Sequence, residues 1–222
     1  MRTSHTAFAI ALSAALAFVA AVLGGARAAD SPATTAGVGL GPGSSLWLNG
    51  TSNVHDFEAK SADVKLEMKR DPAAPNPTDA AGVAALIRAS QVRGIEVEVP
   101  VTSLHSGKSG LDKNMYKALR ADKHPEIEFH MANYKLGEAK GDTVPIQATG
   151  TLQIAGKTRS VELAAKAWPS SKGVVLEGAE PLLMTEYDVK PPTMMLGAMR
   201  VNDHVTVHYR LLLAPAGGAA SK

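Results

Sequence analysis

Alternation of apolar and polar residues is the feature that most constrains how this chain can fold. Over several separate stretches every second residue is apolar, and the residues between are mostly Glu, Lys, Gln, Thr or another polar type. A period of two puts the two sets of side chains on opposite faces of a β-strand, so each stretch predicts a strand with one buried face. The five clearest stretches are 94–101, 126–131, 147–154, 159–167 and 201–211.

Three less regular stretches, 45–50, 54–68 and 174–183, bring the expected number of strands to about eight. Strands of a parallel α/β sheet are buried on both faces and would be continuously apolar, which these are not. An outer-membrane barrel would need an apolar outer face with aromatic girdles, yet aromatic residues make up only 5% of the chain. The sequence therefore predicts an all-β fold, an eight-stranded antiparallel barrel with an apolar interior.

One short helix, at about 112–120, is expected to lie over the mouth of this barrel. Met115 and Leu119 are four residues apart, which gives a helix one apolar face, and Asp112 stands where a capping residue is favoured. Ahead of it, the Pro-rich stretch 70–80 predicts an extended loop, after which 80–88 is a second candidate for a short helix.

The two ends of the chain differ from its middle. Residues 1–28 have a positive start, an apolar run and a small-residue Ala-Arg-Ala site, which together predict a secretory signal peptide; a retained membrane anchor is the alternative. Residues 29–43 and 215–222 are small and polar without periodicity and predict a disordered lead-in and a disordered tail. The folded domain is then 44–214, and the protein is expected to be exported, periplasmic or secreted.

Charge and cysteine content exclude several classes of partner and site. Lys and Arg total 23 against 21 Asp and Glu, and removal of 1–28 takes away Arg2 and Arg27, so the exported chain is formally neutral. A neutral domain lacks the concentrated basic surface that nucleic acid binding requires. The chain has no cysteine, which rules out disulfides, thiol nucleophiles and thiolate metal sites.

Four stretches in order along the chain resemble the YceI family, polyisoprenoid-binding periplasmic or secreted proteins with a lipocalin-like barrel. Gly-Thr-Ser-Asn-Val-His-Asp-Phe at 50–57 is similar to the family's opening strand. The stretch 99–129 carries Asp112 in a short helix and a Pro-x-Ile-x-Phe strand. Gly-x-Leu-x-Ile-x-Gly-x-Thr at 150–158 and Val-Lys-Pro-Pro-Thr at 189–193 complete the set. The Pro-rich insert and Asn53 depart from the family pattern.

The resemblance implies a YceI-like lipid-binding domain that holds a long apolar ligand, an isoprenoid or quinone-type lipid, in its lumen. No other cofactor, no catalytic residue and no metal ligand is expected, and a homodimer is possible for the family. Large apolar residues and flexible methionines suit such a lumen. The predicted lining residues are Phe57, Leu104, Met115, Leu119, Phe129, Met131, Met194 and Met195, and the predicted contacts to a ligand head group are His55, Lys113 and Lys117.

Two alternatives stay open at this point. The barrel could be filled by its own side chains and act as an envelope stress or interaction module, since an eight-stranded barrel can be full or hollow. A hydrolase using Ser103, His105 and Asp112 is weaker, because no Gly-x-Ser-x-Gly elbow is present. A histidine metal site is disfavoured, since the pair His204 and His208 would be roughly 13 Å apart on a strand.

Overall fold

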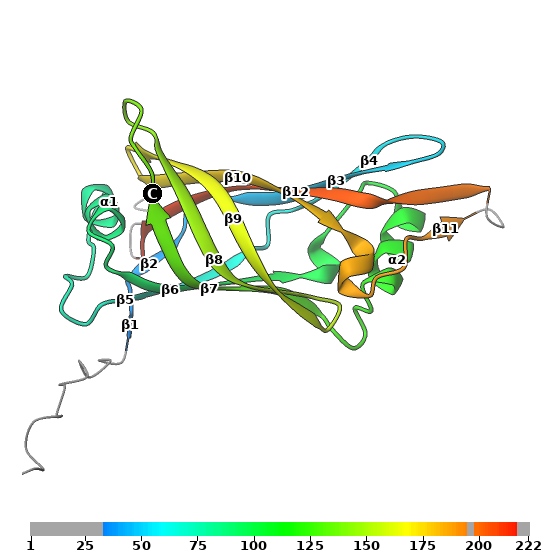
Figure 1. Ribbon diagram of the computed structural model, residues 1–222, viewed down its shortest axis with the longest axis horizontal. Helices are drawn as coiled ribbons and strands as arrows, with labels where there is room; N and C mark the ends of the chain where they lie inside the picture. Colours follow the sequence, from blue (N-terminus) through cyan, green and yellow to red (C-terminus); the bar gives the residue numbers. More distant parts are fainter. Residues whose placement is uncertain (1–32, 195–197, 217–222) are drawn as a thin grey trace, which may run out of the picture. The chain divides into compact units, whose positions relative to one another are not determined.

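The computed structural model describes residues 33–194 and 198–216, most of which lie in one curled antiparallel sheet (Figure 1). Its short strands are β1 (Thr34–Thr35), β2 (Val38–Leu40) and β11 (Thr193–Met194). The longer ones are β3 (Ser45–Ser52), β4 (Phe57–Ser61), β5 (Lys65–Arg70), β6 (Val92–Pro100), β7 (Glu126–Leu136), β8 (Val144–Ile154), β9 (Lys157–Ser170), β10 (Gly173–Leu183) and β12 (Met199–Pro215).

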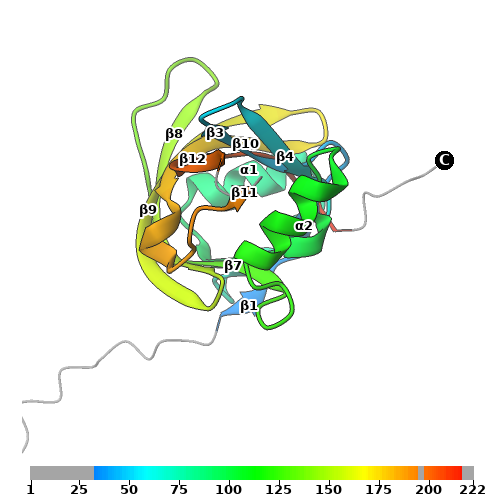
Figure 2. The ribbon, with the colours of Figure 1, turned by 90° about the vertical axis from the view of Figure 1, so that its right-hand side faces the viewer.

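Neighbouring strands follow the order β1-β5-β6-β7-β8-β9-β10-β12-β3-β4, with β2 and β11 paired to β12. Seen end-on, the sheet curls into a ring (Figure 2). In that order β4 and β5 stand near opposite ends of the sheet. The free edge of β4 pairs with His105, a residue of the loop at 104–106: the amide of Lys60 donates to the carbonyl of His105, and the amide of His105 donates to the carbonyl of Lys60, both at 3.0 Å. The antiparallel all-β class is confirmed, but the closed eight-stranded barrel is wrong.

The structure has more strands than expected because one predicted strand is split in two, two short strands lie in the lead-in, and β11 was not predicted. The stretch 54–68 breaks at 62–64, where the Ser61 hydroxyl accepts a hydrogen bond from the amide of Asp63 (3.0 Å), so it forms β4 and β5 instead of one strand. The expected disorder of 29–43 does not hold for the described residues 33–43, which include β1 and β2. Ala36 and Val38 are buried there, which fixes the segment against the sheet.

Predictions for the chain ends fall mostly outside the described residues. The signal peptide at 1–28 lies there, as do residues 217–222 of the tail. Pro215 ends β12, and the amide of Ala216 donates to the carbonyl of Gly37. No helix among the described residues is long and apolar enough to cross a membrane.

Two α-helices lie at opposite ends of the curled sheet (Figure 1). The candidate helix at 80–88 is confirmed, so the helix expected over the mouth is not alone. The first, α1 (Ala80–Arg88), buries Val83, Leu86 and Ile87 in the larger of two apolar clusters. Asp79 caps it by accepting a hydrogen bond from the amide of Gly82 at 2.7 Å.

The second helix, α2 (Ser109–Ala118), lies at one end of the curled sheet (Figures 1 and 2). It corresponds to the helix predicted at 112–120 but begins three residues earlier. Asp112 is inside its first turn and does not cap it. Its carboxylate instead accepts from the amide of Ser106 at 2.8 Å and from the Ser106 hydroxyl at 2.5 Å. Leu119 follows α2 and packs against the smaller apolar cluster, around Tyr187 of the 3₁₀ turn η2 (Met184–Tyr187). A second 3₁₀ turn, η1 (Val101–Ser103), follows β6.

Candidate ligand cavity

A cavity runs inside the curled sheet, between the two apolar clusters. Its volume is about 180 Å³. Nearly all of its wall is aliphatic or aromatic. The lining residues are Leu46, Leu48, Val64, Leu66, Met68, Ile87, Val92, Ile95, Val97, Val99, Leu104, Ile127, Phe129, Met131, Tyr134, Ile146, Ala148, Leu152, Ile154, Leu163, Ala165, Leu176, Glu180, Leu182, Val207, Tyr209, Leu211 and Leu213.

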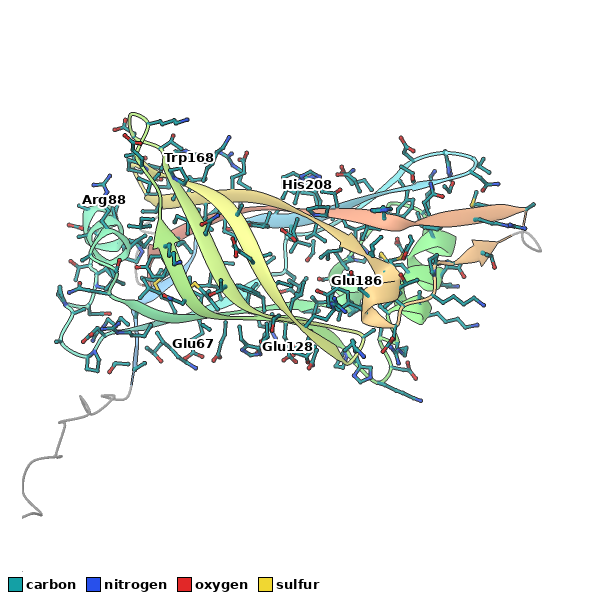
Figure 3. All side chains as sticks on the ribbon, in the orientation of Figure 1. Glu67, Arg88, Glu128, Trp168, Glu186 and His208 are labelled. Atoms are coloured by element: carbon teal, nitrogen blue, oxygen red, sulfur yellow. The ribbon has the colours of Figure 1, made fainter. Side chains whose placement is uncertain are left out.

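The alternation in the sequence builds this wall directly. Ile95, Val97 and Val99 of β6 all line the cavity, whereas Glu96 and Glu98 between them form ion pairs with lysines of β5 on the outer face. Labelled side chains such as Glu67, Glu128 and His208 point away from the sheet (Figure 3). Because each strand contributes its apolar set inwards, the cavity follows from the strand pattern and the curl of the sheet.

One end of the cavity is covered by α1. Ile87 of this helix lines the cavity, and the hydroxyl of Tyr134 on β7 donates to the Ile87 carbonyl at 2.8 Å. That hydrogen bond ties the last turn of α1 to the sheet, at a carbonyl that also accepts from the amide of Ser90 at 3.1 Å. Burial raises the pKa of Tyr134, so this hydroxyl stays protonated and donates.

Polar side chains in the wall are few. The hydroxyl of Tyr209 on β12 crosses over Gly178 of β10 and donates to the carbonyl of Ala164 on β9 at 3.2 Å. A Cβ atom at Gly178 would lie 2.3 Å from that hydroxyl oxygen, so the absence of a side chain there makes room for the tyrosine. Burial raises the pKa of Tyr209 to about 12. Glu180, also on β10, has its pKa raised by desolvation.

Three of the predicted lining residues are in the wall: Leu104, Phe129 and Met131. Phe57 instead packs its ring over Gly50 on the neighbouring strand, and Leu119 belongs to the cluster around Tyr187. Met115 is half-buried on α2 and does not line the cavity. Of the last two candidates, Met195 and the side chain of Met194 lie outside the described part of the chain. Contact between any of these residues and a ligand stays a prediction.

The predicted head-group residues are at the surface. Lys113 and Lys117 are exposed on α2. His55 is exposed in the loop between β3 and β4, where its amide donates to the Ser52 hydroxyl at 3.1 Å. None of the three lines the cavity.

Sequence reasoning missed several wall residues that carried a usable signal. Met68 is fully buried and lines the cavity; it alternates with Glu67 and Lys69, but lay in a stretch assigned as one irregular strand. Glu180 lies on the same strand face as apolar Leu176 and Leu182. An acid at an inward position is the signal in the sequence that could have identified it.

The residues considered for hydrolysis, Ser103, His105 and Asp112, do not form one continuous hydrogen-bonded chain. The Ser103 hydroxyl donates to the carbonyl of Pro100 at 2.6 Å and lies 2.7 Å from the Ser61 hydroxyl. The imidazole of His105 is 3.8 Å from Asp112 and 3.3 Å from the Tyr116 hydroxyl, so a histidine and an acid meet, but the bonds of Ser103 lead elsewhere. No group of three or more potential metal ligands gathers within the described ranges.

Comparison with known proteins assigns the chain to a family. The model of the YceI-like domain matches residues 43–213. The chain belongs to the YceI-like family. This confirms the resemblance that the four sequence stretches suggested. Comparison with curated proteins gave no match.

Two solved structures share the YceI-like fold of this chain. BcnA of Burkholderia cenocepacia is 18% identical with a TM-score of 0.56, over 77% of this chain and 95% of BcnA. A polyisoprenoid binding domain from Saccharophagus degradans implicated in plant cell wall breakdown is 11% identical with a TM-score of 0.57, over 81% of this chain and 99% of that domain. At these identities the likeness concerns the fold alone.

Proposed function

We propose that this YceI-like protein binds and carries a long apolar lipid of the isoprenoid or quinone type, without catalysis. The observation that carries the proposal is the cavity, whose wall is apolar apart from two tyrosines and one glutamate among the described residues. The family gives further support, since one structural neighbour is described as a polyisoprenoid binding domain.

The gain expected from such binding comes from removing the chain from water. Burial of apolar surface contributes about 25 cal/mol per Å², so a ligand that hides about 300 Å² gains roughly 7 kcal/mol before the costs of association. Directional contacts are few in the wall and are not needed for affinity of this size. A cavity of this kind suits ligands that differ in length more than in polarity.

An apolar cavity of about 180 Å³ inside the sheet supports a lumen that its own side chains do not fill completely. Small inward residues such as Ala148 and Ala165 leave space where larger ones would close it. The hydrolase alternative loses support because the Ser103 hydroxyl is bonded to Pro100 and Ser61. The signal-like residues 1–28 support a place in the bacterial cell envelope, in the periplasm or outside the cell.

Adjacent alanines of β9 provide a direct test with a matched control. Ala165 lines the cavity, whereas Ala164 is exposed on the outer face. Ala165→Phe places a ring in the lumen, and we expect binding of an isoprenoid such as geranylgeraniol, followed by displacement of an apolar fluorescent probe, to weaken at least tenfold. Ala164→Phe adds the same ring outside and leaves the affinity unchanged. Equal affinities in the two variants, or no binding by the unaltered protein, would contradict the proposal.

A further inference from the structure

Glu180 has an unusual position in the wall of the cavity. It lies on β10, where Leu176 and Leu182 of the same face also line the cavity, and among the described lining residues it alone has a charged type of side chain. The next strand position with a carboxylate, Glu177, faces outwards and pairs with Arg210. β10 therefore presents one paired acid to solvent and one unpaired acid to the lumen.

No cation compensates Glu180 in the described structure. No hydrogen bond or ion pair to its carboxyl group is found there. Burial, and to a smaller extent the charge of Glu180, raises the pKa of Tyr209 on β12 and of Tyr187 of η2. The basic residues of the facing part of β9 are engaged at the surface, Lys157 with Asp188 at 3.2 Å and Arg159 with Glu186 at 3.6 Å. An acid in such a place costs free energy of folding, and an apolar residue would avoid the cost. Stability of the sheet does not account for it.

We propose that Glu180 is the specificity-determining residue of the cavity, selecting lipids with an uncharged hydrogen-bonding group over lipids that carry a carboxylate or phosphate. This inference rests on the proposed function, because it concerns the ligand of the same cavity. The preferred class includes chains that end in a hydroxyl, an amide or a ring carbonyl.

The chemistry of a carboxyl group in an apolar lumen explains the selection. In its protonated form it donates one hydrogen bond and accepts others, and as a carboxylate it accepts from hydroxyl or amide hydrogens. A second anion close to it would face repulsion that the apolar wall screens poorly. Desolvation raises the pKa of Glu180, which shows that this part of the lumen disfavours negative charge.

The test compares two ligands with the same chain, geranylgeraniol and geranylgeranyl monophosphate, in protein freed of lipid. The quantity of interest is the dissociation constant of the phosphate divided by that of the alcohol, because this ratio cancels the contribution of the shared apolar chain. In the unaltered protein the alcohol binds more tightly. In Glu180→Gln, which removes the charge but keeps the shape, we expect the ratio to fall about tenfold, mainly through tighter binding of the phosphate.

Two further variants control this result. Glu177→Gln removes an acid from the outer face of the same strand and leaves the ratio unchanged. Glu180→Leu removes the charge and the hydrogen-bonding group together, so the ratio falls and the alcohol binds more weakly as well. Thermal unfolding of each variant establishes that it is folded.

The outcomes separate this inference from the proposed function. A ratio that stays the same in Glu180→Gln and Glu180→Leu, with both ligands still bound, would overturn the role of Glu180 and leave the carrier function standing. A protein that binds neither ligand in any form would overturn both.

Discussion

At the scale of single residues, an acid placed in an apolar wall links stability to pH. Desolvation raises the pKa of Glu180 in the folded protein above its ordinary value of 4.5. Below that value the group is protonated in both states and contributes nothing. As pH rises through 4.5, the unfolded chain releases the proton while the folded protein retains it. Glu180 therefore lowers the free energy of unfolding more and more until pH reaches the raised pKa, and the reduction stays constant above it.

Glu180→Gln therefore stabilises the ligand-free protein at high pH and has little effect at low pH. We expect the melting temperature to rise by about 2 °C at pH 8, and the difference from the unaltered protein to vanish near pH 4. Thermal unfolding of both proteins between pH 4 and pH 8 measures this. A loss of stability at pH 8 would show that the carboxylate has a favourable partner instead.

Gly150 is in close contact with a neighbouring strand, which the alternation of residues does not predict. It occupies an inward position of β8, and the backbone of β7 passes over it at the bulge between Met131 and Asn133. A Cβ atom at Gly150 would stand 2.2 Å from the carbonyl oxygen of His130. Nothing in the sequence reports that approach, because it depends on how two strands far apart in the chain are registered.

Gly150→Ala should consequently destabilise the sheet by about 2 kcal/mol, since backbone has to move and no flexible side chain can yield. Denaturant unfolding gives the value. Gly39→Ala is the control, because a Cβ atom there meets nothing within 4 Å. Similar losses in the two variants would mean that β7 and β8 are not as close as described.

At the scale of elements, local patterns predicted most strands, while the starts and interruptions of elements depended on side-chain hydrogen bonds. Alternation gave the faces of β6, β8, β9 and β12 because period two is a local property. The break between β4 and β5 is made by the Ser61 hydroxyl, and the start of α2 by the reach of Asp112 back to Ser106. Both side chains are compatible with other structures, so the sequence alone does not distinguish them.

The attachment of α1 provides a prediction at this scale. Tyr134→Phe removes the hydrogen bond to the Ile87 carbonyl and should cost about 1 kcal/mol of stability, with faster amide hydrogen exchange in α1. Tyr209→Phe is the matched control, since its hydroxyl bonds to Ala164 on β9 and its loss leaves exchange in α1 unchanged. Exchange in α1 that does not respond to Tyr134→Phe would contradict a role for this bond in fastening the helix.

At the scale of the whole domain, the proposed function depends on a space that no single element contains. The family resemblance and the apolar faces predicted a lumen and three of its wall residues, Leu104, Phe129 and Met131. Which residues stand at the ends of the cavity could not be predicted, because α1, α2 and the loop at 101–106 reach the sheet through contacts distant in sequence. For that reason two apolar residues predicted to line the cavity pack elsewhere: Phe57 over Gly50, and Leu119 against the cluster around Tyr187.

Native mass spectrometry of protein purified without detergent, followed by organic extraction, is the decisive test of lipid carriage. We expect a stoichiometric adduct of a few hundred daltons that extracts as an uncharged isoprenoid or quinone-type lipid and that is lost in Ala165→Phe but retained in Ala164→Phe. A bare protein mass that stays bare when isoprenoids are added would contradict the account.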